Sequence, residues 1–199
     1  MKNKKLNFIF FLITITSFLY VYSLFKYKDN KIISKSDAVI SSSNKNYEYD
    51  KNIFGILPNN WKSIKPNSSM RFAEFVISNE LGYFSLIVFK NIGGSKIQNI
   101  DRWYKQFSGE NLNQLIQETK SMDIENNKIT FIQTSGSFNG GMGQSKPIDK
   151  AGLLGFIIEV NNEIFYFKAV SEIDILVNSK EDFINTIMNF PLIKKSKFL

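Results

Sequence analysis

The order of apolar and polar residues divides the chain into a continuous apolar run, a polar stretch and a region of mixed periods. The run 6–25 carries no side chain that is charged at neutral pH, and about 20 apolar residues are what a helix needs to cross the ~30 Å hydrocarbon core of a membrane. Residues 26–50 are rich in Ser, Asn, Lys and Asp, a composition typical of a flexible tether. We therefore expect a transmembrane helix within 1–25, then the tether, then one folded domain over 51–199.

Within the domain, short apolar runs and apolar–polar alternation predict strands. The strand-like segments are 53–57, 61–64, 70–77, 83–89, 128–134, 152–160 and 164–170. In the third of these, the alternation predicts that Met70 and Phe72 face the core while Arg71 and Glu74 face water. Short turns join neighbouring strands, as at the Asn-rich turn 161–163, and this indicates antiparallel pairing.

Other segments of the domain change to helical spacing. The apolar positions of the first such segment are Ile97, Ile100, Trp103, Tyr104 and Phe107. They predict a helix over 97–107. A shorter helical turn is expected at 112–119, and a closing helix at 179–190 that Pro191 ends. This order of elements predicts an α+β fold, an antiparallel sheet with helices packed on it, and argues against a doubly wound nucleotide-binding fold.

The flanks of the run 6–25 favour an uncleaved signal anchor over the alternative, a cleaved signal peptide. Signal peptides carry about 7–15 apolar residues and a small-x-small cleavage site, whereas this run is longer and ends without an Ala-x-Ala pattern. The simplest topology keeps the lysine-rich first residues in the cytoplasm and exports the domain. We therefore expect a single-pass protein of the inner (cytoplasmic) membrane whose domain faces the periplasm or extracytoplasmic side.

Net charge and missing residue types exclude several classes of function. The chain carries 25 Lys plus Arg against 18 Asp plus Glu, a net charge of +7, but more than half of this excess lies in residues 1–50. Nucleic-acid binding is therefore not expected. The absence of Cys and His excludes disulfides, a lipid-modified cysteine, Ser-His-Asp and Cys-His catalysis, and thiolate or imidazole metal sites. No cofactor and no metal are expected.

Three patterns that carry chemistry in other proteins are weak in this chain. The Gly-rich segment 135–151 lacks the Gly-Lys-Ser/Thr end of a P-loop, so we interpret it as a mobile flap or a ligand-contacting loop. Hydrolysis by two carboxylates needs a pair of acids, and no spacing singles one out. The nominal candidates are Asp101, Glu110, Asp123 and Glu125. A Ser-Lys pair would use Ser145 and Lys146, which point apart because they are adjacent.

Motif residues are spread over most of 61–171. They are Trp61, Pro66, Met70-Arg71, Phe75, Gly93-Gly94, Asn99-Ile100-Asp101-Arg102-Trp103, Gln106-Phe107, Ser135-Gly136 and Phe165-Tyr166-Phe167-Lys168. Together they resemble a family of uncharacterised exported bacterial proteins, many of which are lipoproteins; this chain departs by lacking the cysteine. More remotely, the element order is similar to the sandwich of the photosystem II subunit PsbP and the nuclear-transport factor Mog1. The resemblance implies a binding or accessory role, and the family offers no established activity.

Among the polar residues, Arg102 is the strongest candidate for a binding residue. Gln106 shares its helix face, whereas Trp103 belongs to the apolar stripe and is expected to anchor the core. Arg102 either pairs with a sheet carboxylate such as Glu74 or is offered to an anionic ligand. The candidate ligand-binding residues are Trp61, Arg102, Gln106, Asn139 and Gln144, and no catalytic residue is proposed. We expect a membrane-anchored, non-enzymatic envelope protein that binds a protein or small-molecule partner, with a carboxylate-dependent hydrolase as the alternative.

Overall fold

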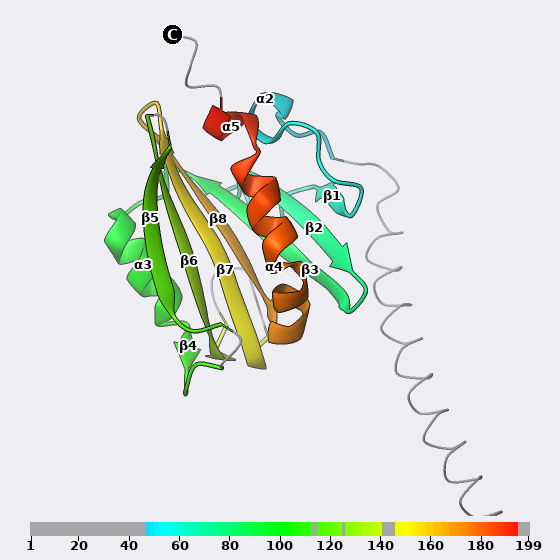
Figure 1. Cartoon of the computed structure of the whole chain (residues 1–199), viewed down its shortest axis with the longest axis vertical. Helices are drawn as coiled ribbons and strands as arrows, with labels where there is room; N and C mark the ends of the chain where they lie inside the picture. The colour runs from blue at the N-terminus through cyan, green and yellow to red at the C-terminus, as the bar shows by residue number, and fades with distance from the viewer. Residues whose placement is uncertain (1–46, 113–114, 125, 141–145, 195–199) are drawn as a thin grey trace, which may run out of the picture. The chain divides into compact units, whose positions relative to one another are not determined.

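A computed structural model describes residues 47–112, 115–124, 126–140 and 146–194, all within the compact unit Lys45–Leu199. In this part of the chain, eight antiparallel strands form one sheet in the order β1-β2-β3-β8-β7-β6-β4, and β5 pairs with the same edge of β6 as β4 does (Figure 1). The strands are β1 Trp61–Ile64, β2 Ala73–Asn79, β3 Gly82–Lys90, β4 Phe107–Ser108, β5 Glu118–Ile124, β6 Asn127–Phe138, β7 Ile148–Val160 and β8 Glu163–Glu172. The described helices are α2 Lys51–Phe54, α3 Lys96–Tyr104, α4 Ile173–Met188 and α5 Pro191–Lys194.

This arrangement corrects the predicted fold class. One large antiparallel sheet dominates the described residues, so the domain is β-rich and not the α+β sandwich of the PsbP/Mog1 kind that the sequence predicted. The difference arises because β6 and β7 extend beyond their apolar centres and β5 was not recognised as a strand. Among the described helices, none is long and apolar enough to cross a membrane. The run 6–25, predicted as a transmembrane helix, lies outside the described residues.

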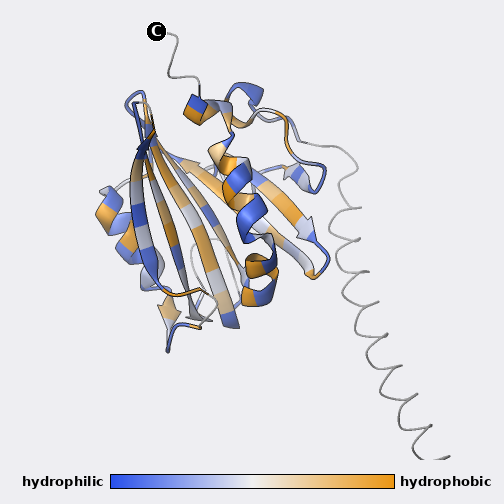
Figure 2. Cartoon of the chain, in the orientation of Figure 1, coloured by the Kyte–Doolittle hydropathy of each residue, from blue (hydrophilic) through white to orange (hydrophobic). Residues whose placement is uncertain are grey.

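The larger core lies between one face of the sheet and α4. Alternate residues of the central strands point into it, as Phe165 and Phe167 of β8 do, and both are at most 1% exposed. From the helix, Leu176, Phe183 and Ile187 pack against them. Figure 2 shows apolar residues along the strands behind α4 and polar residues along much of the outward side of the helix. This is the amphipathic pattern that binds a helix to a sheet.

The opposite face of the same sheet carries α3 and a smaller core. A capping box starts this helix: the Gln98 N–H donates to Ser95 Oγ (3.2 Å), and the Ser95 N–H donates to Gln98 Oε1 (2.8 Å). Trp103 is only 4% exposed. Its ring lies so close to Gly155 that a Cβ there would be 2.6 Å from it. The prediction that Trp103 anchors the core is confirmed.

The ends of the Gly-rich segment 135–151 are strand, which shortens the flap or loop predicted there to the connection between β6 and β7. β6 continues to Phe138 and β7 starts at Ile148, while the middle of the segment lies outside the described residues. Gly136 has a φ of +146°, and a Cβ on it would lie 2.7 Å from the Ser108 carbonyl oxygen. Glycine is thus required at this position, where β4 approaches β6.

Three other segments also differ from their predictions. The segment 53–57 is not a strand, because its first residues end α2, whose first turn is capped by the side chain of Asp50. The helical turn predicted at 112–119 is absent from its described residues, and β5 begins at Glu118. Pro191 starts α5 as well as following α4, because the fixed φ of proline suits the first position of a helix.

We predict that Gly155→Ala destabilises the domain, because the new Cβ would overlap the Trp103 ring and lie 3.2 Å from the Phe167 carbonyl oxygen. Overpacking of this kind costs about 1–3 kcal/mol, and Trp103→Ala, which empties the same contact, should cost about 3–5 kcal/mol. Gly93→Ala is the control, since a Cβ at Gly93 would meet no atom within 4 Å. Urea denaturation followed by circular dichroism gives the free energies of unfolding. Equal stability of Gly155→Ala and Gly93→Ala would contradict the proposed packing.

Candidate functional site

A cavity of about 420 Å³ lies beside α3, over β3 and β8. The register pairs Ile87 of β3 with Lys168 of β8, and Lys168 with Gly155 of β7, so these residues form one row on the α3 face. Because Trp103 lies over Gly155, α3 forms one wall and the other two residues of the row contribute to the floor. The apolar lining also includes Phe89, Ile92 and Val170, and the polar lining includes Arg102 and Gln106.

Arg102 is oriented by Asn99, which is completely buried. The Asn99 Nδ2 donates to the carbonyl oxygens of residues 93–95 at 3.3, 3.4 and 2.9 Å, and its Oδ1 accepts from Arg102 Nη1 at 3.0 Å. The amide therefore fixes the loop before α3 and the guanidinium together. Among the described residues no carboxylate lies within 4.0 Å of Arg102. Its predicted pairing with Glu74 is wrong, because Glu74 pairs with Arg71.

Lys168 is a half-buried cation on the floor of the cavity. Its Nζ lies 5.8 Å from the ring centroid of Trp103 and 5.7 Å from that of Phe138, and it donates a short hydrogen bond to Gln106 Oε1. No carboxylate of the described residues lies within ion-pair distance of it. Loss of hydration disfavours the charged form, so burial lowers the pKa of Lys168 from its usual 10.5 to about 8. The aromatic faces offset part of that cost.

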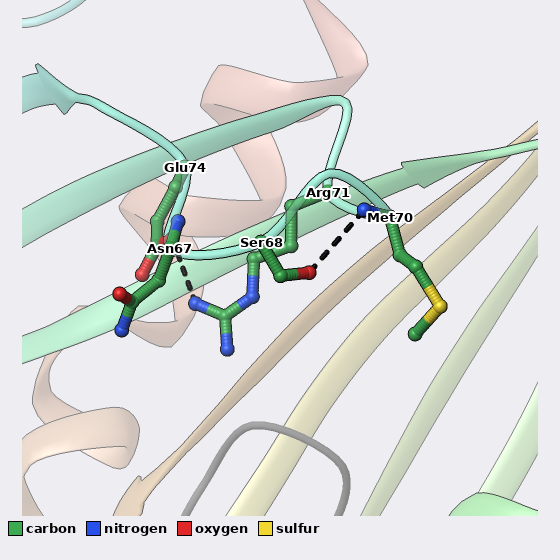
Figure 3. Close-up of polar contacts among 5 residues, drawn as sticks. All are labelled: Asn67, Ser68, Met70, Arg71 and Glu74. Carbon is green, nitrogen blue, oxygen red and sulfur yellow. Dashed lines mark hydrogen bonds and ion pairs between the residues drawn. The ribbon is translucent and has the colours of Figure 1, made fainter.

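The mouth of the cavity is bounded by the turn that precedes β2. Arg71 Nη1 and Glu74 Oε2 form a buried ion pair at 2.7 Å, and the Asn67 N–H donates to the same carboxylate oxygen at 3.0 Å (Figure 3). Within the turn, the Met70 N–H donates to Ser68 Oγ at 3.3 Å. These bonds hold the turn against the strand, and Met70 lines the cavity while its side chain stays 56% exposed.

The orientation predicted for this part of the chain is wrong. The sequence placed Met70 and Phe72 in the core and Arg71 and Glu74 in water, but both charged residues are buried and Phe72 is 38% exposed. The reason is that alternation applies only within a strand, and β2 begins at Ala73. Arg71 belongs to the turn before the strand and reaches Glu74, which lies within β2 and is buried because both faces of this strand are covered.

The five predicted ligand-binding residues do not all lie at one site. Arg102 and Gln106 line the cavity. Asn139 is exposed and adjoins them, since its backbone N–H donates to the Gln106 carbonyl oxygen at 2.9 Å, but it does not line the cavity. Trp61 is 6% exposed and lies in the core on the α4 face of the sheet. Gln144 lies outside the described residues.

A second hollow of about 570 Å³ lies between α2, β1 and α4. It is bordered by Trp61 and by the amides of Asn60, Asn185 and Asn189, with Asp182 as its charged residue. Its lining contains no lysine or arginine. The cavity beside α3 is the stronger candidate site because it combines a half-buried cation and a second, oriented cation with apolar walls.

The acids considered for hydrolysis are not gathered at either hollow. Asp101, Glu110 and Asp123 are exposed and line neither of them. Glu125, like Ser145 of the Ser-Lys pair, lies outside the described residues. Within the described part of the chain, no three acidic, His or Cys side chains come together in a way that could hold a metal ion.

Lys168 is the residue of the cavity that sequence reasoning missed as a binding residue. A signal existed, because it is the one residue of the apolar run 164–170 that is charged at neutral pH, and burying an unpaired charge costs free energy. The motif residues that carried the family resemblance also collect here. Those that line the cavity are Met70, Gly93, Arg102, Trp103, Gln106 and Lys168.

Comparison with known proteins gives little beyond the geometry. No family model and no curated protein matches the chain. Among solved structures, the chain is similar to PA94 from Pseudomonas aeruginosa, a protein of unknown function described as a candidate regulator. The two share 9% sequence identity over 68% of this chain and 84% of PA94, with a TM-score of 0.37. A likeness of this degree carries no conclusion about fold or function.

We predict that Lys168 makes stability depend on pH above pH 8. Its folded pKa of about 8 lies below the usual 10.5, so between these values the unfolded chain binds a proton that the folded chain does not. Stability should therefore rise with pH across this window, as the cost of the buried charge disappears. Urea denaturation at several pH values would show this rise in the wild type relative to Lys168→Met. The exposed Lys105→Met variant is the control, and an unchanged pH dependence in Lys168→Met would refute the assignment.

Proposed function

We propose that the chain is a non-enzymatic binding protein of the cell envelope, anchored to the cytoplasmic membrane by the run 6–25, with the domain on the extracytoplasmic side. The observation that carries the binding role is the cavity beside α3, whose described lining contains Lys90, Arg102 and Lys168 but no Asp or Glu. The anchoring and the location rest on the length and composition of the apolar run.

The dimensions of the cavity support a small-molecule ligand. Ligand sites usually measure about 300–1,000 Å³ and combine apolar walls with a few placed polar groups. The cavity, at about 420 Å³, has apolar side chains such as Ile87, Phe89 and Val170, and α3 and β8 supply Arg102, Gln106 and Lys168. Rigid elements hold such groups more accurately than loops do.

A carboxylate-dependent hydrolase, the alternative from the sequence, has less support. Catalysis by two acids requires carboxyl groups that flank one substrate bond. Asp101, Glu110 and Asp123 lie on the surface away from both hollows. A binding role requires only what the cavity beside α3 already contains.

We predict that filling this cavity abolishes small-molecule binding without loss of stability. Trp61→Phe leaves Trp103 as the only indole of a chain that has two, so that its emission reports on the cavity. In this background, the full chain in dodecyl maltoside is titrated with 3-phenylpropionate and with its neutral counterpart 3-phenylpropanol. Gly93 lines the cavity, and a Cβ added there would meet no atom within 4 Å. Gly93→Ala and Gly93→Leu should therefore weaken binding progressively while the thermal midpoint stays constant.

The titration of the Gly93 variants tests whether this cavity is a ligand site. Binding of at least one probe that falls from glycine to alanine to leucine supports the site. Failure of both probes to change Trp103 emission, or equal binding by all three variants, would remove the support for a ligand site in this cavity.

We predict that the domain is accessible from outside the cytoplasmic membrane. In intact spheroplasts of an expressing bacterium, externally added protease should degrade the domain, while a cytoplasmic marker protein stays intact until lysis. This follows if the lysine-rich N-terminus stays inside. Protection of the domain until the membrane is broken would contradict the proposed topology.

A further inference from the structure

Resting on the proposed function, we propose that the ligand of the α3 cavity is a small monocarboxylic acid with an apolar body. Its carboxylate would lie between the guanidinium of Arg102 and the ammonium of Lys168, and its apolar part against Ile87, Phe89 and Val170. The cavity thus selects a free organic acid over a neutral molecule of the same shape.

The charge of the cavity favours an anionic ligand. Three cations line it. Lys90 is paired with Glu163 at 2.6 Å, whereas among the described residues neither Arg102 nor Lys168 has a carboxylate within 4.0 Å. A nearby carboxylate, Glu74, lies in the same row of the sheet, paired with Ile87. It is already held by Arg71 at 2.7 Å and by the Asn67 N–H at 3.0 Å. The positive charge of the cavity is therefore available to a ligand.

Arg102 and Lys168 have hydrogen-bond donors that can bind a carboxylate. A guanidinium has five N–H donors and an ammonium three. Within the described structure, Arg102 uses one bond to Asn99 and Lys168 one to Gln106. The Asn99 bond holds the guanidinium in a fixed orientation, which suits the two-point recognition of a carboxylate.

The apolar walls favour a ligand with an apolar body. Ile87 and Val170 are buried, and Phe89 and Ile92 belong to the hydrophobic cluster on this face. A ligand that is charged throughout would lose its hydration against these side chains without compensation. A ligand with one charged end and one apolar body matches a lining that has cations on one part and apolar side chains on the other. A dianion such as a phosphate monoester matches this lining less well.

The test uses the full chain with Trp61→Phe in dodecyl maltoside, with Trp103 emission as the signal. We expect 3-phenylpropionate to bind at least about 10-fold more tightly than 3-phenylpropanol, since hydrogen bonds to charged groups contribute more than neutral ones. Arg102→Gln and Lys168→Gln should each remove most of this preference, because they weaken the binding of the acid more than that of the alcohol. Lys105→Gln removes a charge at the end of the same helix, outside the cavity, and should retain the preference.

Two further titrations distinguish the ligand classes. Phenyl phosphate should bind more weakly than 3-phenylpropionate, and tighter binding of the phosphate would overturn the monocarboxylate. Phosphatidylglycerol added to the micelles should not compete, and competition that depends on Arg102 would assign the site to a lipid headgroup instead of a free acid. Equal affinity for the alcohol and the acid would refute this inference while leaving the binding function intact. Failure of both to bind would refute the proposed function itself.

Discussion

The indole of Trp103 lies on the bare backbone of Gly155, and the candidate site depends on this contact. A helix of nine residues such as α3 is marginal by itself in water, so it persists because its apolar side is buried against the sheet. A glycine leaves room for the ring where a Cβ would come within 2.6 Å, so the sheet specifies where the helix lies. Arg102 comes from this helix and Lys168 is the neighbour of Gly155 on β8. One packing contact therefore brings two cations from distant parts of the chain to one cavity.

The face of the sheet that carries this cavity is not arranged for stability alone. Lys168 lies between Ile87 and Gly155 in the row across β3, β8 and β7, where an apolar side chain would be buried at no cost in hydration. Glu74 lies in the same row, and its charge is matched by Arg71 at 2.7 Å. Within the described structure the row thus holds one matched and one unmatched charge. The unmatched charge is the one that faces the cavity, which is how binding sites commonly differ from ordinary cores.

The elements that sequence analysis found are those whose patterns are local. The strands β3 and β8 appear as continuous apolar runs, and α3 as a stripe of helical spacing, although the prediction ran past Tyr104 because Phe107 is apolar and belongs to β4. β5 was missed because nearly all of its side chains are exposed. An edge strand needs no apolar residue when backbone pairing with β6 holds it, so its sequence carries no alternation to detect.

The site could be predicted only in part, because both faces of the sheet are covered, one by α4 and the other by α3. Where both faces are buried, both alternate sets of side chains become apolar, and the pattern no longer shows which face a residue joins. Lys168 was therefore left out although it lies on the face of the cavity, and Trp61, assigned to the site, lies on the opposite face. Arg102 and Gln106 were found together because a single helical segment relates them. The pairing of Ile87 with Lys168 supplies the missing information, and it joins residues too far apart for any local pattern to contain it.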